Sequence, residues 1–204
     1  MLDSKGFDLW ADGYDKSVGL SDERNTYPFA GYKRLLNRIY NIVLRKKNPS
    51  VLDLGFGTAV LTTRIYEAGC VVSGQDFSAR MIEIARAKMP DAFLVQGDLS
   101  DGLAAPLKGR KYDFIIATYS LHHLDFTGKI RLLRELRGQL AEGGQILIGD
   151  VAFATQAELE ACRAQAGDDW DADEMYIVFD ELRAVFPEMV FEPLSPCAGL
   201  LALA

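Results

Sequence analysis

The stretch VLDLGFGTAV, residues 51–60, decides the fold of this 204-residue chain. An apolar run that includes Asp53 leads into two glycines, Gly55 and Gly57, which are separated by one residue. Further along, a second strand-like run ends in another acid, Asp76. A strand, a glycine turn, a helix and a second strand with a carboxylate at its end predict the nucleotide-binding half of an α/β fold.

The residues around this turn narrow the choice of nucleotide. A dinucleotide-binding turn has a third glycine three positions after Gly57, and Val60 stands there instead. The Asp53 carboxylate would repel a pyrophosphate, whereas it could accept hydrogen bonds from an ammonium group or order water beside it. The pattern therefore favours a nucleoside with a cationic tail over a nicotinamide dinucleotide.

Strand-like and helix-like segments alternate after Pro49. The strand-like runs are almost wholly apolar, which predicts strands buried on both faces, and the segments between them have apolar residues at helical spacing. This alternation predicts a doubly wound, mostly parallel sheet with helices on both faces. The predicted strands are residues 51–54, 70–75, 92–95, 112–118 and 145–149.

The two ends of the chain depart from this alternation. Residues 29–44 have the apolar spacing of a helix that precedes the first strand. Residues 155–186 look helical, and their acids at 168–174 are expected either to begin a solvated helix or to favour a cationic acceptor. Residues 190–194 and 200–204 are joined by a link too short for a helical crossover, so they predict a terminal hairpin.

Composition limits the class of protein. With 49% hydrophobic and 25% charged residues, the chain is typical of a globular domain, and we expect one domain over residues 1–204. No apolar run approaches the ~18 residues of a membrane span, and the N-terminus lacks the pattern of a secretory signal. The three cysteines are far apart, which fits a reducing cytoplasm. A net charge of -7 disfavours binding to nucleic acid.

Polar side chains stand near the ends of four predicted strands. They are Asp53, Asp76, Asp98 and Thr118. In open parallel sheets, ligands bind beyond the carboxyl ends of the strands. Any one of these acids alone could simply form a turn, but their recurrence at successive strand ends predicts a ligand site.

Over residues 48–152 the sequence resembles a class I S-adenosylmethionine-dependent methyltransferase of the small-molecule, bacterial type. The family implies a Rossmann-like, seven-stranded sheet whose last strand is antiparallel. Residues 7–15 resemble its N-terminal helical cap. The resemblance rests on the glycine loop at 51–59, GQDFS at 74–78, QGDL at 96–99, residues 112–124 with their SLHHL ending, and LAEGGQI at 140–146.

This resemblance divides the single domain into three parts and assigns the cofactor contacts. Residues 1–47 would form the cap, 48–152 the cofactor-binding core, and 153–204 the lid helices and the terminal hairpin. The implied cofactor-binding residues are Tyr14, Asp53, Gly55, Phe56, Gly57, Asp76, Phe77, Asp98, Leu99 and Thr118.

The family also implies a role for each contact. Asp76 would bind the ribose hydroxyls, with Phe77 beside the adenine. Asp98 would accept a hydrogen bond from the adenine amino group, and the Leu99 N–H would meet a ring nitrogen. Tyr14 could close over the cofactor tail.

The methionine part of S-adenosylmethionine would lie along the glycine loop. Asp53 would flank it, and Thr118 and Tyr119 would border the transferred methyl group. Phe56 and Ala59 depart from the common family pattern, which more often has a small residue and a glycine at these positions. The departures affect the expected shape of the loop and no more than that.

The only two histidines, His122 and His123, follow the fourth predicted strand. Together with Tyr119 they are the candidate catalytic residues, since an imidazole could accept an acceptor proton. They could equally pack or hydrogen-bond locally, because such an ending is common in the family whatever the substrate. No metal site is expected, because adjacent histidines cannot easily face one ion and no acid stands at ligand spacing.

The sequence thus predicts a cytoplasmic enzyme that transfers a methyl group from S-adenosylmethionine to a small acceptor by in-line displacement. Alternatives are a protein that binds this cofactor without methyl transfer, or another use of the same cofactor. The expected partner is a small-molecule acceptor, with no nucleic acid or membrane, and the enzyme would be a monomer or a homodimer. The acceptor pocket would come from residues 1–30 and 150–186.

Overall fold

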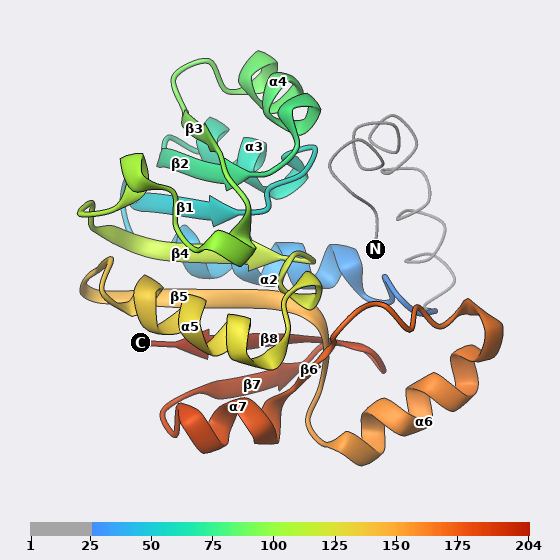
Figure 1. Ribbon diagram of the computed structural model, residues 1–204. Coiled ribbons are helices and arrows are strands. Elements are labelled where there is room, and N and C mark those ends of the chain that lie inside the picture. Colours follow the sequence, from blue (N-terminus) through green and yellow to red (C-terminus); the bar gives the residue numbers. More distant parts are fainter. Residues whose placement is uncertain (1–25) are drawn as a thin grey trace.

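The structure is a computed structural model that describes residues 26–204, so the predicted cap at residues 7–15 and Tyr14 lie outside the described residues (Figure 1). The α-helices are α2 (Tyr32–Val43), α3 (Val60–Glu67), α4 (Ala79–Lys88), α5 (Phe126–Arg137), α6 (Gln156–Ala166) and α7 (Phe179–Val185). The strands are β1 (Ser50–Leu54), β2 (Val71–Asp76), β3 (Phe93–Gln96), β4 (Tyr112–Thr118), β5 (Leu140–Phe153), β6 (Ile177–Val178), β7 (Val190–Pro193) and β8 (Ala198–Leu203). Short 3-10 turns are η1 (Leu99–Asp101), η2 (Ala105–Leu107), η3 (Leu121–His123) and η4 (Gly167–Asp169).

The predicted α/β fold is confirmed. The strands form one sheet in the order β3-β2-β1-β4-β5-β8-β7, and the two-residue strand β6 pairs with the end of β5. Strands β1 to β5 are parallel to one another, while the last strand, β8, is antiparallel to both β5 and β7. The strand order reverses between β1 and β4, and such a switch point is where open α/β sheets bind their ligands.

Helices cover both faces of the sheet, as its apolar strands require (Figure 1). One core cluster packs α2, α3 and α4 against one face, and a second cluster packs α5 and α7 against the other. Within β5, Leu147 belongs to the first cluster and Ile146 and Ile148 to the second, because successive side chains of a strand point to opposite faces. Among the described helices, none is both long and apolar enough to cross a bilayer.

Two elements differ from their predicted bounds. The helix expected from residue 29 begins at Tyr32, after Gly31 at a φ of +75°. The fifth strand, expected at 145–149, extends to Leu140–Phe153 because Gly143 and Gly144 continue it through an irregular register instead of a turn. A Cβ on Gly144 would lie 2.8 Å from the Tyr112 carbonyl oxygen, so only glycine lets the two strands approach here.

The acids at 168–174 do not begin a helix, so that prediction is wrong. Helix α6 ends at Ala166, and after the short η4 turn the chain continues without regular structure to β6. Tertiary hydrogen bonds hold this segment extended: the Met175 N–H donates to the His122 carbonyl at 2.8 Å, and the Lys129 ammonium donates to the Met175 carbonyl at 2.6 Å. These bonds outweigh the weak local preference of acids for a helix start.

Candidate active site

A cavity of about 440 Å³ opens at the carboxyl ends of β1, β2 and β4, at the switch point of the sheet. Its size is that of a ligand pocket, which typically measures about 300–1,000 Å³. The predicted cofactor residues meet here, apart from Tyr14, which is not described, and Asp53. Those that line the cavity are Gly55, Phe56, Gly57, Asp76, Phe77, Asp98, Leu99 and Thr118.

The glycine loop forms the floor of this cavity. Gly55 and Gly57 have φ angles of +69° and +53°, which side chains other than glycine rarely adopt. A Cβ on Gly55 would lie 2.5 Å from the Ser120 Cβ, so the loop also depends on close backbone approach. The bulky Phe56 is accommodated because its ring packs over Gly74 of β2, where a Cβ would collide with it at 2.7 Å. The departure at Phe56 therefore leaves the loop open to the cavity.

Asp76 connects this loop to the next strand. Its Oδ2 accepts a hydrogen bond from the Gly57 N–H at 2.8 Å, and its Oδ1 accepts one from the Ser78 N–H at 2.9 Å. Asp76 also lines the cavity, and a carboxylate accepts hydrogen bonds from hydroxyl groups. Asp98, by contrast, is exposed at the cavity rim, and its Oδ1 accepts from the Ser100 N–H at 2.8 Å.

Asp53 stands one side chain behind the cavity wall. It is 1% exposed, and its Oδ2 accepts a hydrogen bond from the hydroxyl of Thr62, a lining residue. Its Oδ1 is buried and has no hydrogen-bond partner within the described residues. Burial raises the pKa of the Asp53 carboxyl to about 7, although the Thr62 bond opposes this shift. The site therefore holds a buried carboxyl group that titrates near neutral pH.

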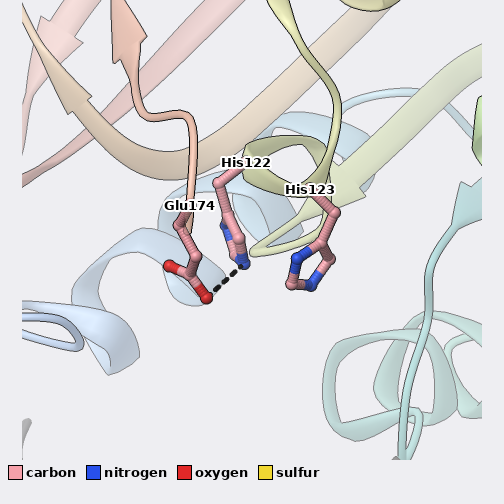
Figure 2. Close-up of side chains that lie close together, drawn as sticks. All are labelled: His122, His123 and Glu174. Carbon is pink, nitrogen blue, oxygen red and sulfur yellow. Dashed lines mark ion pairs between the residues drawn. The ribbon is translucent and has the colours of Figure 1, made fainter. Parts of the chain in front are cut away.

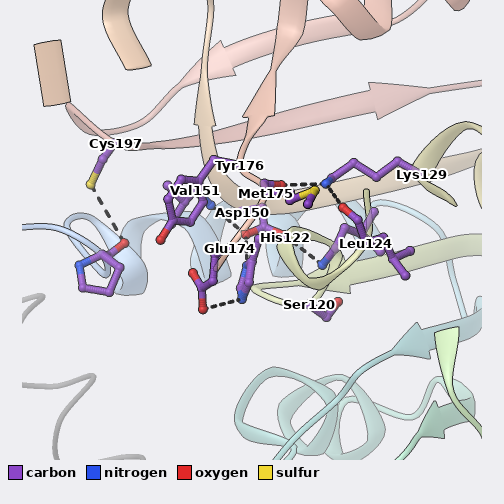
Figure 3. A network of polar contacts seen from close by, with 12 residues as sticks. Ser120, His122, Leu124, Lys129, Asp150, Val151, Glu174, Met175, Tyr176 and Cys197 are labelled. Atoms are coloured by element: carbon purple, nitrogen blue, oxygen red, sulfur yellow. Dashed lines mark hydrogen bonds and ion pairs between the residues drawn. The ribbon is translucent and has the colours of Figure 1, made fainter. Parts of the chain in front are cut away.

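A polar network lies behind the other end of the cavity (Figure 3). The His122 Nδ1 lies 2.6 Å from Oδ1 of Asp150, a fully buried residue of β5. Asp150 also accepts hydrogen bonds from the Leu121 and Val151 N–H groups, at 3.0 and 2.8 Å. Although burial favours neutral forms, this pairing raises the pKa of His122 and lowers that of Asp150. The pair fixes the orientation of the His122 ring.

The structure brings a third polar side chain to the two histidines. Oε1 of Glu174 lies 3.5 Å from Nε2 of His122, and the two histidine rings have centroids 4.2 Å apart (Figure 2). Burial, together with the neighbouring His122, lowers the pKa of His123 to about 4, so its ring is neutral at pH 7. No acid stands at ligand spacing from the histidines in the sequence, but the fold brings Glu174 to them from a distant segment.

Of the candidate catalytic residues, Tyr119 and His123 line the cavity, whereas His122 lies behind His123. Tyr119 has a φ of +50° and packs against the rings of Phe29 and Tyr32, at 5.2 and 5.3 Å between centroids. Tyr32 also lines the cavity. Helix α2 and the segment before it thus contribute an aromatic wall that the sequence motifs do not identify.

The aromatic residues of the 170–176 segment pack against the start of the described chain. Trp170 stacks on Tyr27 with ring centroids 5.0 Å apart, and Tyr176 meets both rings edge-on. Met175 is 51% exposed. Trp170 and Tyr176 therefore pack against Tyr27, and neither lines the cavity at the switch point.

Sequence reasoning missed Asp150, Glu174 and Lys129. Asp150 had a usable signal, because it follows the apolar run at residues 146–149 as Asp76 follows its own strand. Lys129 is 3% exposed and donates to the carbonyls of Leu124 and Met175, which nothing in an ordinary helix pattern indicates. Glu174 had no signal, since its role depends on a long-range contact.

Comparison with known proteins agrees with this geometry. Residues 51–144 match the family model described as a methyltransferase domain. A protein named "Uncharacterized methyltransferase" from Anoxybacillus flavithermus is 36% identical over 160 residues, which cover 78% of this chain and 72% of that protein. The chain belongs to this methyltransferase family. A second relative of the same name, from Geobacillus thermodenitrificans, is 35% identical over 188 residues. The match covers 88% of this chain and 84% of that protein.

Solved structures share the fold of this methyltransferase. The complex of DhpI with S-adenosylhomocysteine (SAH) has a TM-score of 0.71 at 18% identity, and the match covers 98% of this chain and 93% of DhpI. Magnesium protoporphyrin IX methyltransferase from Synechocystis, also with bound SAH, has a TM-score of 0.70 at 16% identity and covers 96% and 95% of the two chains. These likenesses confirm the Rossmann-like architecture that the sequence predicts.

Proposed function

We propose that the cavity at the switch point binds S-adenosylmethionine and that the enzyme transfers its methyl group to a small-molecule acceptor. The observation that carries this proposal is the convergence of Gly55, Gly57, Asp76 and Asp98 around one cavity of ligand size. Among the solved neighbours, DhpI forms complexes with S-adenosylmethionine or SAH, and magnesium protoporphyrin IX methyltransferase has bound SAH. The cofactor supplies an electrophilic methyl group, so the chain's own residues have to bind, orient and exclude water.

The residues present fit this cofactor. Gly57 lines the cavity and has nothing within 4 Å of its Cβ position, so a ligand's methionine portion can approach the backbone there. The buried Oδ1 of Asp53, which has no hydrogen-bond partner among residues 26–204, suits the cofactor's ammonium group, reached through water. At the other end, Asp76 accepts from the ribose hydroxyls, and the exposed Asp98 accepts from the adenine amino group. Phe77 and the Leu99 N–H complete the adenine contacts.

The acceptor would enter at the end of the cavity formed by Thr118, Tyr119 and His123. Their side chains border the position of the methyl group and hold the acceptor in line with it. An acceptor that must lose a proton could pass it to a neighbouring imidazole, with His122 held in place by Asp150. We propose a single domain that works in the cytoplasm on a small acceptor, as a monomer or homodimer and without nucleic acid.

Calorimetric titration of the full chain with S-adenosylmethionine tests the cofactor assignment. Asp76→Ala removes a charged acceptor for the ribose and releases the Gly57 N–H, so the affinity should fall about 10- to 100-fold, as expected for lost hydrogen bonds to a charged group. Asp91→Ala is the matched control, because Asp91 is an exposed acid whose carboxylate accepts only from Tyr66 among the hydrogen bonds of the described residues. Failure of the unaltered chain to bind S-adenosylmethionine would reject the proposal.

A further inference from the structure

The η3 turn and the 170–176 segment bring three side chains that can bind a metal together at the edge of the cavity. The ligand atoms of His122, His123 and Glu174 all lie within 4.8 Å of one another. Figure 2 shows the Glu174 carboxylate facing the His122 ring, with the His123 ring beside it. Two imidazoles and one carboxylate form a common ligand set for divalent first-row metals.

The spacing of one pair in this cluster, His122 and Glu174, fits an ion between the two ligand atoms. Nε2 of His122 and Oε1 of Glu174 are 3.5 Å apart. A charge-assisted hydrogen bond between such atoms would bring them to about 2.7–2.9 Å. Two atoms that each lie about 2.1 Å from one tetrahedral ion are about 3.4 Å apart, which agrees with the observed separation.

The surroundings of His122 match those of a metal ligand. Its Nδ1 is held by the Asp150 carboxylate at 2.6 Å, which leaves Nε2 directed at Glu174 (Figure 3). Metal-binding histidines commonly donate their second ring N–H to a carboxylate in this way, which fixes the ring and increases its basicity. Asp150 is itself held by two backbone N–H groups, so this orientation exists before any ion binds.

The cluster also opens toward the cavity. His123 lines the cavity, so an ion held by these three side chains would face it. Three protein ligands leave a fourth position of a tetrahedral ion open for a water molecule or an oxygen of a substrate. A site that served the fold alone would have four protein ligands and no contact with the cavity.

We propose that His122, His123 and Glu174 bind one divalent first-row metal ion, such as Zn²⁺, Co²⁺ or Mn²⁺, and that this ion holds an oxygen atom of the methyl acceptor. The acceptor part rests on the proposed function, whereas metal binding itself does not. When the ion is bound it takes the place of an imidazole base: it would lower the pKa of an acceptor hydroxyl, whose proton leaves to solvent. The oxygen then forms a bond to the methyl carbon, and the sulfur keeps the electron pair of the carbon–sulfur bond that breaks.

The tag-free, full-length chain is first treated with a chelator and then titrated with metal, which tests the site. Calorimetry should show that one equivalent of Zn²⁺ binds per chain. Co²⁺ should produce the visible absorption that is typical of a four-coordinate ion. Glu174→Gln and His123→Ala each remove one ligand and should weaken binding at least about a hundredfold. Circular dichroism of both variants checks that they fold.

Asp169→Asn is the matched control, because it makes a similar charge change at an exposed acid of the η4 turn, just before this segment. It should bind both ions as the unaltered chain does. Absence of one-equivalent binding, or equal weakening by Asp169→Asn and Glu174→Gln, would overturn the inference. S-adenosylmethionine binding is measured on the same metal-free samples. If it persists without metal binding, only this inference fails; if metal binds and S-adenosylmethionine does not, the proposed function and the acceptor role fail.

Discussion

Gly55 is required for two reasons: its positive φ angle and its close approach to Ser120. Its φ of +69° is strained for any residue with a Cβ, and the space where that Cβ would stand is occupied by Ser120. Ser120 cannot easily move, because its hydroxyl donates to the Leu54 carbonyl at 2.8 Å and so ties the end of β1 to the segment after β4. Gly57 has a similar backbone conformation, at +53°, but nothing lies within 4 Å of its Cβ position.

This difference makes the two glycines a matched pair for mutation. Gly57→Ala should cost about 1–2 kcal/mol of folding free energy, the strain of a left-handed conformation alone. Gly55→Ala adds the collision with Ser120 and should cost about 1–3 kcal/mol more, as overpacking does. Urea unfolding of both variants measures the difference. Equal losses would show that the contact with Ser120 carries no energetic weight.

Asp53 determines a pH dependence of stability. Its pKa is raised to about 7 in the folded chain, from 3.8, because it is buried. Between these two values the folded state holds a proton that the unfolded state releases, so stability falls as pH rises from about 4 to about 7. Relative to Asp53→Asn, the unaltered chain should lose up to about 4 kcal/mol over this range. Denaturant titrations at several pH values measure this, and a constant difference between the two proteins would contradict it.

At the scale of elements, Lys129 of α5 connects the 170–176 segment to the η3 turn. Its ammonium donates to the carbonyls of Leu124 and Met175, and burial lowers its pKa to about 8. The Met175 N–H in turn donates to the His122 carbonyl at 2.8 Å. Glu174 therefore faces His122 because the N–H and the carbonyl of the next residue, Met175, are both held by hydrogen bonds.

Lys129→Met should loosen this segment. The buried Leu124 carbonyl and the partly buried Met175 carbonyl lose their donor, at about 1–3 kcal/mol for a buried group, so hydrogen exchange of the Met175 amide should become about 10- to 100-fold faster. Lys111→Met is the control, because Lys111 also donates to a carbonyl, that of Gly138 at 2.8 Å, but at an exposed position. Exchange mass spectrometry compares the variants, and unchanged protection at Met175 in Lys129→Met would contradict the connection.

At the scale of the whole molecule, one sheet joins the two core clusters, and the cavity lies at the carboxyl ends of its parallel strands. A ligand there touches residues that follow β1, β2, β3 and β4, so its binding energy adds to the stability of the whole domain. The two clusters share every central strand, which favours a single cooperative unfolding transition.

S-adenosylmethionine at about 100 times its Kd should therefore stabilise the enzyme by about 2.7 kcal/mol and raise its Tm by about 5–11 °C. Scanning calorimetry with and without the cofactor measures this shift. Asp76→Ala at the same cofactor concentration should show a clearly smaller one. A shift confined to part of a split transition would contradict the cooperative domain.

The sequence by itself determined the sheet and one side of the site. Continuous apolar runs predict buried parallel strands, and acids such as Asp76 and Asp98 follow directly from the strand ends, because strand direction and spacing are local properties. The extent of β5 and the structure of the acidic segment were not predictable, since a glycine bulge and tertiary hydrogen bonds overrode local preference.

Only the tertiary structure decided what stands beside the histidines. Asp150 and Glu174 lie 28 and 52 positions from His122 in the sequence, and no periodicity relates residues so far apart. They meet His122 because β5 pairs with β4 and because Lys129 holds the backbone next to Glu174. Nucleotide recognition follows from local motifs, whereas the surroundings of the acceptor depend on long-range packing, which a sequence of this kind does not display.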